Sequence, residues 1–219
     1  MVKRRSNKYV CVSDHLLYVR IIPSTAQPEI SRVEALRLSQ DRLRPLDHRP
    51  SGRSFENNHY GVLTFEGGSD GKIVSGCQLF KTRELWGFNA YYLSDLYGQR
   101  GIPTSCHEAA LEAGLRTYLQ FARESLGTQL PITVELGASN IAGHVLFMDP
   151  RYTNGVKEWG PLYEESVSLR RTVTTGSDEE IDAILLAAFE KIFDAGGRKR
   201  PDRYNGFPGD KAGESPRGY

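Results

Sequence analysis

Three sequences of the form Ser-x-x-Glu divide this chain into segments. They begin at Ser31, Ser105 and Ser177, and each precedes a run whose apolar residues have helical spacing. In such a capping box the serine side chain accepts a hydrogen bond from the backbone N–H three residues later, and the glutamate binds the serine N–H in return. The run at residues 177–197 is the clearest, because its apolar residues recur at i, i+3, i+4 and i+7. We therefore predict one helix after each of these serines.

The segments between the predicted helices favour β-strands, because they are rich in β-branched and aromatic residues and are bounded by turn residues. The predicted strands are residues 15–23, 59–65, 72–80, 84–93, 131–137, 143–148 and 164–173. Short connections join the second, third and fourth of them, which favours an antiparallel meander. The order βαβββαβββα predicts an α+β fold, in which a largely antiparallel sheet is packed by three helices.

The composition predicts one globular domain with a basic segment at each end. The chain has 219 residues, of which 39% are hydrophobic and 25% are charged, as in ordinary globular domains. We predict a basic N-terminal arm at residues 1–13, a single α+β domain at residues 14–197 and a flexible basic tail at residues 198–219. The tail is rich in Gly, Pro and charge, and it lacks a periodic apolar pattern that would offset the entropy of ordering it.

Neither a membrane segment nor a metal site is predicted. No apolar stretch approaches the roughly 18 residues of a membrane span, and the N-terminus lacks the pattern of a signal peptide. We therefore expect a cytoplasmic protein without membrane contact. Cys11, Cys77 and Cys106 include no Cys-x-x-Cys pair, and no two histidines lie at a metal-ligand spacing. We predict no cofactor.

Five strings of residues resemble, in their order, a region of known bacterial proteins. They are YVRIIPS, RSFENNHYGVLTF, CQLFKTRELWGFNAYYL, IPTSCHEAALEAGLRTYLQFAR and WGPLYEESVSLRRTV. The region that they resemble follows the Schlafen-type, AlbA-like nucleic-acid-binding domain in uncharacterised bacterial proteins, and the resemblance covers roughly residues 14–202. The Glu-Phe-Lys signature strand of that first domain has no counterpart in this chain, so no residue-level function carries over. The resemblance implies a domain that works next to nucleic acid, as a fragment of such a protein or as a stand-alone relative.

The first functional hypothesis is a non-catalytic accessory or binding domain for nucleic acid or a protein partner. Residues 54–197 carry 11 Lys and Arg against 19 Asp and Glu, so the surplus of cations lies outside this segment. Part of that surplus is an arginine-rich strip between residues 32 and 53, whose candidate polyanion-binding residues are Arg37, Arg42, Arg44, Arg49 and Arg53. Phosphate binding by such a strip would weaken steeply with salt, because counterions are released on association.

Two other functions stay open from the sequence. A hydrolase-type enzyme would have a site built from the loop residues Glu56, Asn58 and His59, which combine acid, amide and imidazole chemistry just before a strand. Asparagine in this position is also typical of a simple turn. The sequence gives no positive sign of catalysis, although catalytic triads can assemble from distant residues. A structural oligomerisation domain is the third hypothesis, and the sequence does not determine the oligomeric state.

Residues 79–93, LFKTRELWGFNAYYL, place aromatic side chains among basic ones. Such a segment is typical either of a buried strand or of a platform on which nucleic-acid bases stack. Strand alternation puts Trp86 and Phe88 on one face, and Glu84 stands where RNA-recognition strands carry a basic residue. We predict that Trp86 and Phe88 pack in the core beneath a helix.

Overall fold

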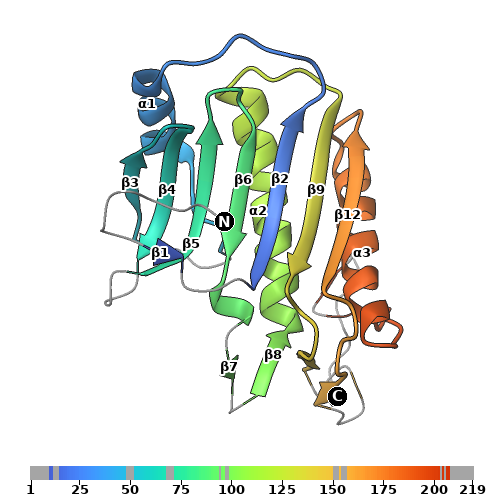
Figure 1. The fold of residues 1–219 in the computed structure, drawn as a ribbon. Helices are drawn as coiled ribbons and strands as arrows, with labels where there is room; N and C mark the ends of the chain where they lie inside the picture. Colours follow the sequence, from blue (N-terminus) through green and yellow to red (C-terminus); the bar gives the residue numbers. More distant parts are fainter. Residues whose placement is uncertain are drawn as a thin grey trace.

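The main element of the fold is an antiparallel sheet with three helices on one of its faces (Figure 1). The computed structural model describes residues 10–11, 15–47, 52–67, 72–93, 95–96, 99–149, 153, 157–202, 204 and 206–207. The strands in spatial order are β12 (Ser166–Val173), β9 (Ile132–Ser139), β2 (Leu16–Pro23), β6 (Leu85–Asn89), β5 (Lys72–Phe80), β4 (Gly61–Gly67) and β3 (Ser54–Asn57). The short strand β1 (Val10–Cys11) pairs in parallel with the start of β5. The predicted α+β class with a largely antiparallel sheet is confirmed.

The three helices cover the face of the sheet that points away from the viewer in Figure 1. The first, α1 (Arg32–Arg42), packs against β3 and β4, while α2 (Thr104–Glu124) packs against β2 and β6, and α3 (Asp178–Ala195) packs against β12 and α2. The main hydrophobic core lies between these helices and the sheet. None of the described helices is long and apolar enough to span a membrane. We call the other face of the sheet, which carries no helix in the described part of the chain, the open face.

A smaller sheet lies beyond one end of the main sheet (Figure 1). Its strands in spatial order are β11 (Glu158–Trp159), β10 (Val145–Phe147), β8 (Gln99–Pro103) and β7 (Asp95–Leu96). The 3-10 turn η1 (Tyr91–Leu93) leads from β6 towards it. The strand predicted at residues 143–148 is β10 and therefore belongs to this second sheet. The sequence-based prediction lacks β1, β3, β7, β8 and β11, because strands of two to five residues carry too little periodicity.

Two of the three predicted helix starts are confirmed. The side chain of Ser31 accepts a hydrogen bond from the backbone N–H of Glu34, and α1 begins at the next residue. The side chain of Ser177 accepts one from the backbone N–H of Glu180 at the start of α3. In both cases the serine satisfies one of the N–H groups that the first turn of a helix leaves without a partner.

The helix predicted after Ser105 is present as α2, but the capping box predicted for it is wrong. The helix α2 begins at Thr104, and its N-cap position is occupied by Pro103, which forms no side-chain cap. The glutamate of the expected box, Glu108, is buried and forms an ion pair with Arg200. The glutamate three residues after Ser105 therefore pairs with a distant residue instead of capping the helix.

Glu180 holds the turn that precedes α3. Its carboxylate oxygens accept hydrogen bonds of 2.7–2.9 Å from the backbone N–H groups and hydroxyls of Thr174 and Thr175 and from the N–H of Gly176. Desolvation alone would raise the pKa of Glu180, but these hydrogen bonds outweigh it and lower the pKa to about 2. The ionised glutamate is therefore part of the folded turn.

We expect Glu180→Gln to lower the free energy of unfolding at neutral pH by roughly 1 kcal/mol, as the loss of a helix-cap interaction does. The pKa of Glu180 in the folded state lies below the usual value of a glutamate. Its carboxylate therefore contributes fully to the free energy of unfolding above the unfolded-state pKa, and this contribution is lost as the pH falls through the folded-state pKa. The difference between the proteins should therefore vanish between about pH 4.5 and pH 2. Urea unfolding across this range measures it, and two parallel pH profiles would contradict the assignment.

The segment after α3 packs against the domain, so the prediction of a flexible tail from residue 198 is wrong for its described part. Arg200, Tyr204 and Phe207 are buried. The Nε and Nη2 atoms of Arg200 donate to the two carboxylate oxygens of Glu108 at 2.7 and 2.8 Å, and Nη2 also donates to the Tyr204 carbonyl at 2.9 Å. The guanidinium carbon lies 5.5–6.0 Å from the ring centroids of Phe189, Tyr204 and Phe207. A few isolated apolar residues among Gly, Pro and charge give no periodic pattern, which is why the sequence did not reveal this packing.

Most other residues of the two predicted end segments lie outside the part of the chain that the structure describes. Residues 10 and 11 of the predicted N-terminal arm form β1, and the rest of the arm lies outside the described residues. Residues 208–219 of the predicted tail also lie outside them.

Candidate interface on the open sheet face

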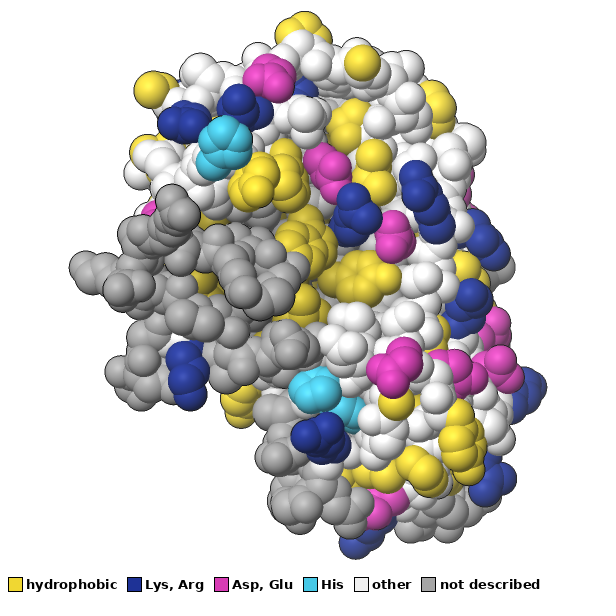
Figure 2. All heavy atoms as spheres, viewed as in Figure 1, with side chains coloured by type: hydrophobic (Ala, Val, Ile, Leu, Met, Phe, Trp, Pro, Cys, Tyr) yellow, Lys and Arg dark blue, Asp and Glu magenta, His cyan; other side chains and the backbone are white. Residues whose placement is uncertain are grey.

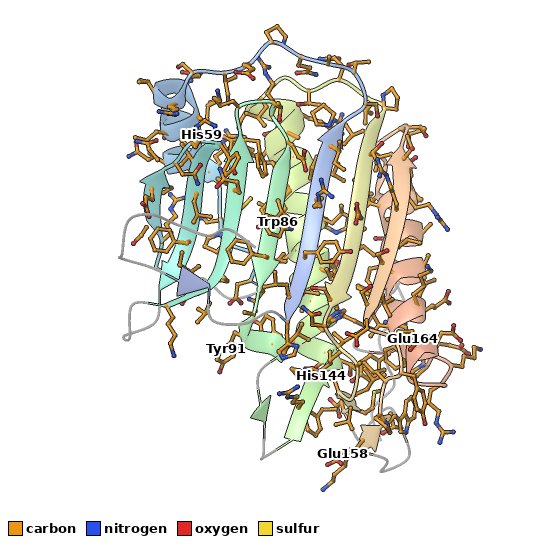
Figure 3. All side chains as sticks on the ribbon, in the orientation of Figure 1. His59, Trp86, Tyr91, His144, Glu158 and Glu164 are labelled. Carbon is orange, nitrogen blue, oxygen red and sulfur yellow. The ribbon has the colours of Figure 1, made fainter. Side chains whose placement is uncertain are left out.

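The open face carries aromatic side chains at the centre of the main sheet. Tyr18 of β2 is the cross-strand partner of Phe88 of β6, and Arg20 is the partner of Trp86. Cross-strand partners share a face, so these four side chains form two adjacent rows. Figure 3 shows Trp86 on β6, in the middle of this face.

Trp86 and Phe88 face away from the helices, so the prediction that they pack beneath a helix is wrong. It is Leu85 and Gly87 that face α2, and a Cβ atom added at Gly87 would lie 2.3 Å from a ring carbon of Tyr118. Phe88 is nevertheless buried, in a small cluster on the open face, whereas Trp86 stays partly exposed. The two ring centroids are 5.6 Å apart. The remaining buried members of this cluster are Leu63, Phe65 and Ile73.

Glycines on the neighbouring strands allow two of the rings to extend along the sheet. A Cβ atom added at Gly76 of β5 would lie 2.7 Å from a ring carbon of Phe88, and one added at Gly137 of β9 would lie 2.8 Å from the hydroxyl of Tyr18. Gly76 is the cross-strand partner of Phe88, and Gly137 is the partner of Tyr18. The two aromatic side chains therefore reach over adjacent strands, which larger residues at the glycine positions would prevent.

Arg20 lies between two carboxylates on this face. Its Nε and Nη2 atoms donate to Glu84 Oε1 at 3.1 and 2.6 Å, and its Nη1 atom donates to Glu135 Oε2 at 3.4 Å. The hydroxyl of Tyr18 donates to Glu135 Oε1 at 3.3 Å. Burial, and then the negative charge of Glu135, raises the pKa of Tyr18, so its hydroxyl stays protonated and can donate. These contacts hold the guanidinium and the phenol in fixed positions beside Trp86.

The side chains of this region line a groove of about 360 Å³. The lining residues are Leu16, Tyr18, Arg20, Phe80, Glu84, Trp86, Glu135 and Ser139. All of them are partly exposed. Figure 2 shows hydrophobic side chains gathered over the middle of the face, beside a basic side chain that lies between acidic ones. We call this feature the aromatic groove.

The predicted arginine strip is partly neutralised within the fold. Arg37 donates from Nε and Nη2 to the carboxylate of Glu34 at 3.0 and 2.8 Å, one helical turn away. Arg42 pairs with Glu124 of α2 at 2.7 Å. An arginine that already faces a carboxylate adds little net charge with which to attract phosphate.

The other residues of the strip differ in their roles. The guanidinium of Arg53 donates to the backbone carbonyls of Gln40 and Leu43 at 2.6 and 2.9 Å and so satisfies the C-terminal end of α1. Arg44 is exposed. Arg49 lies outside the described residues.

The loop proposed for a hydrolase site forms a turn. The Asn58 Oδ1 atom accepts a hydrogen bond from the Tyr60 N–H at 2.9 Å, and its Nδ2 atom donates to Gln78 Oε1 at 2.6 Å. His59, which Figure 3 labels, is exposed. Its ring lies edge-on to that of Tyr60, and Glu56 is partly exposed on β3. Neither these residues nor their neighbours in the loop line the aromatic groove. Among the described residues, no three His, Cys, Asp or Glu side chains could together hold a metal ion.

The prediction from sequence missed the contributions of β2 and β9 to the aromatic groove. In β2, Leu17, Val19 and Ile21 are buried towards the helices, so alternation alone would have assigned Tyr18 and Arg20 to the opposite face. The sequence carries this signal. It carries no signal that β9 lies beside β2, which is what brings Glu135 to Arg20.

A scan against protein-family models finds no match to this chain, and comparisons with curated proteins and with solved structures find none either. The functional conclusion therefore depends on the geometry of the chain itself.

Proposed function

We propose that this chain is a non-catalytic binding domain that uses the aromatic groove to bind a protein partner. The observation that carries the proposal is that Tyr18, Arg20 and Trp86 lie side by side, partly exposed, at the centre of the open face. Trp, Tyr and Arg are the residue types that contribute most to binding free energy at protein interfaces, where they cluster near the centre. Strands of a packed sheet also present them without the entropy cost of ordering a loop.

The charges of the open face favour a protein partner over a polyanion. Arg170, Glu135 and Arg20 are successive cross-strand neighbours on β12, β9 and β2, and Glu84 binds the far side of Arg20. Along this row, positive and negative side chains thus alternate and balance. Binding to a phosphate backbone depends on an excess of cations, whereas alternating charges select a surface with a complementary pattern. The sequence resemblance implies a domain that works next to nucleic acid. In this proposal it acts there as an accessory domain that binds another protein.

The proposal is tested with peptides selected only for binding to the wild-type domain. Because a central tryptophan anchor is worth about 2 kcal/mol or more, we expect Trp86→Ala to weaken the selected peptides about 30-fold or more. Fluorescence anisotropy of labelled peptides measures the dissociation constants. Tyr163→Ala is the matched control, because Tyr163 is 85% exposed and lies outside the groove. It should leave the affinity unchanged.

Three other outcomes would each contradict the proposal. Peptides that bind the wild-type domain and the Trp86→Ala variant equally would place the interface elsewhere. Labelled single-stranded RNA or DNA that bound with a steep salt dependence, and lost binding in Trp86→Ala, would identify the groove as a nucleic-acid site. A wild-type dimer that became a monomer in Trp86→Ala, measured by light scattering, would identify the occupant as a second copy of this chain.

A further inference from the structure

A second and larger groove, of about 660 Å³, lies on the helix side of the domain between α2 and the start of α3. Its lining residues are Arg116, Leu119, Gln120, Arg123, Glu124, Thr128, Gln129, Leu130, Asp178 and Ile181. Leu119 and Ile181 are members of the main core whose surfaces reach the groove, with Leu130 packed against them. Leu119, Leu130 and Ile181 supply the apolar part of the lining, which we call the floor, and polar groups supply the larger part.

All but one of the charged side chains that line this groove are paired within the described chain. Arg116 donates to Asp178 at 3.1 Å and also to Asp182. Glu124 pairs with Arg42 at 2.7 Å. Arg123 is the exception: it is exposed and forms no ion pair or hydrogen bond with the described residues. The guanidinium of Arg123 is therefore the uncompensated charge of the groove.

Thr128 adds a buried polar group without a partner. Its residue is 2% exposed, and its hydroxyl forms no hydrogen bond in the structure. A buried hydroxyl without a partner costs free energy, roughly 1–3 kcal/mol, unless a ligand supplies the missing bond. Thr128 lines the same groove as Arg123.

We infer that this helix-side groove binds a carboxylate attached to an apolar chain. The carboxylate pairs with Arg123 and accepts a hydrogen bond from the Thr128 hydroxyl, and the apolar chain lies on the floor formed by Leu119, Leu130 and Ile181. A guanidinium and a hydroxyl are both donors, and a carboxylate is acceptor-only, so the polar groups match. Volumes of this size are usual for small-molecule sites. The inference does not depend on the aromatic groove or on its protein partner.

The probes are octanoate, 1-octanol and octylamine, added to the wild-type protein and followed by chemical shifts of backbone amides in two-dimensional NMR. We expect octanoate to shift the amide signals of Thr128 and its neighbours, with weaker or absent effects of the alcohol and the amine. Arg123→Gln should weaken octanoate binding at least tenfold. Arg170→Gln is the control, because Arg170 is an exposed arginine on the other side of the sheet.

Thr128→Val separates a ligand-binding role from a structural one. Valine has nearly the same shape and removes a hydroxyl that has no partner, so the free energy of unfolding should stay the same or rise. Octanoate binding should fall about three- to tenfold. Equal binding of alcohol and acid, no amide shifts with octanoate, or unchanged affinity in both variants would overturn the inference.

The source of the carboxylate is decided with a peptide probe. A short peptide that ends in Leu-Leu is compared with its C-terminal amide in the same titration. If the free-acid peptide binds more tightly than octanoate and the amide does not bind, the natural ligand is a protein C-terminus. If octanoate binds more tightly than the peptide, it is a small aliphatic acid, and either result supports the inferred site.

Discussion

Arg200→Leu is expected to lower the free energy of unfolding by about 3–5 kcal/mol at neutral pH, because it leaves Glu108 as a buried carboxylate without its counter-charge. The two side chains are only 1% and 3% exposed, and they are joined by a bidentate pair of hydrogen bonds. The substitution also removes the contacts of the guanidinium with three aromatic rings. Urea or guanidinium unfolding measures the loss.

The pH dependence of this variant follows from Glu108. Burial raises the pKa of Glu108, and Arg200 acts in the opposite direction. Without Arg200 the folded-state pKa moves further above the unfolded value. A carboxyl group whose pKa is raised in the folded state lowers the free energy of unfolding when it ionises. This loss is absent below the unfolded-state pKa and grows as the pH rises through that pKa. The stability difference between the variant and the wild-type protein should therefore shrink towards about pH 4.

A double variant, Glu108→Met with Arg200→Leu, is the matched control. It removes both charges and leaves apolar groups of similar size, a replacement that is often neutral or stabilising for buried ion pairs. We expect it to recover most of the stability that the single variant loses. If Arg200→Leu were as stable as the wild type, or if the double variant were no more stable than the single one, the ion pair would not stabilise the packing of Arg200, Tyr204 and Phe207 against the domain.

The Glu108 contact also shows how far the sequence predicts the helices of this fold. The serine caps at Ser31 and Ser177 were predictable, because capping is a local interaction between residues three apart. Glu108 has the same spacing, but its partner is 92 residues away. A local pattern cannot distinguish a glutamate that caps a helix from one that is recruited by a distant arginine.

The same distinction applies to the candidate sites. Arg42 looked like part of a cationic strip, yet its charge is balanced by Glu124, which the sequence places far away on another helix. Alternation grouped Trp86 with Phe88 correctly but indicated the wrong face for the helices, because the helix-facing side of β6 carries only Leu85 beside Gly87 and Asn89. The deciding contact is between Gly87 and Tyr118, where only a residue without a side chain admits the ring.

The face assignment of β6 gives the second large expected effect. Leu85→Ala should lower the free energy of unfolding by about 2–5 kcal/mol, because Leu85 is 0% exposed in the main core and its loss leaves a cavity beneath α2. Trp86→Ala should cost less than half as much, although it removes more atoms, because Trp86 lies partly exposed on the open face.

The two variants are compared by urea unfolding under the same conditions, together with peptide binding. Leu85→Ala should keep the peptide affinity of the domain as long as it is folded, since Leu85 does not line the aromatic groove. Trp86→Ala should stay folded and lose affinity. The opposite result, in which Trp86→Ala unfolds the domain and Leu85→Ala is tolerated, would mean that the helices cover the other face of the sheet. In that case the aromatic side chains would be core residues, and the open face would offer no anchor for a partner. Because the neighbouring positions 85 and 86 belong to the same strand, they differ chiefly in the face that they occupy, and the comparison isolates that difference.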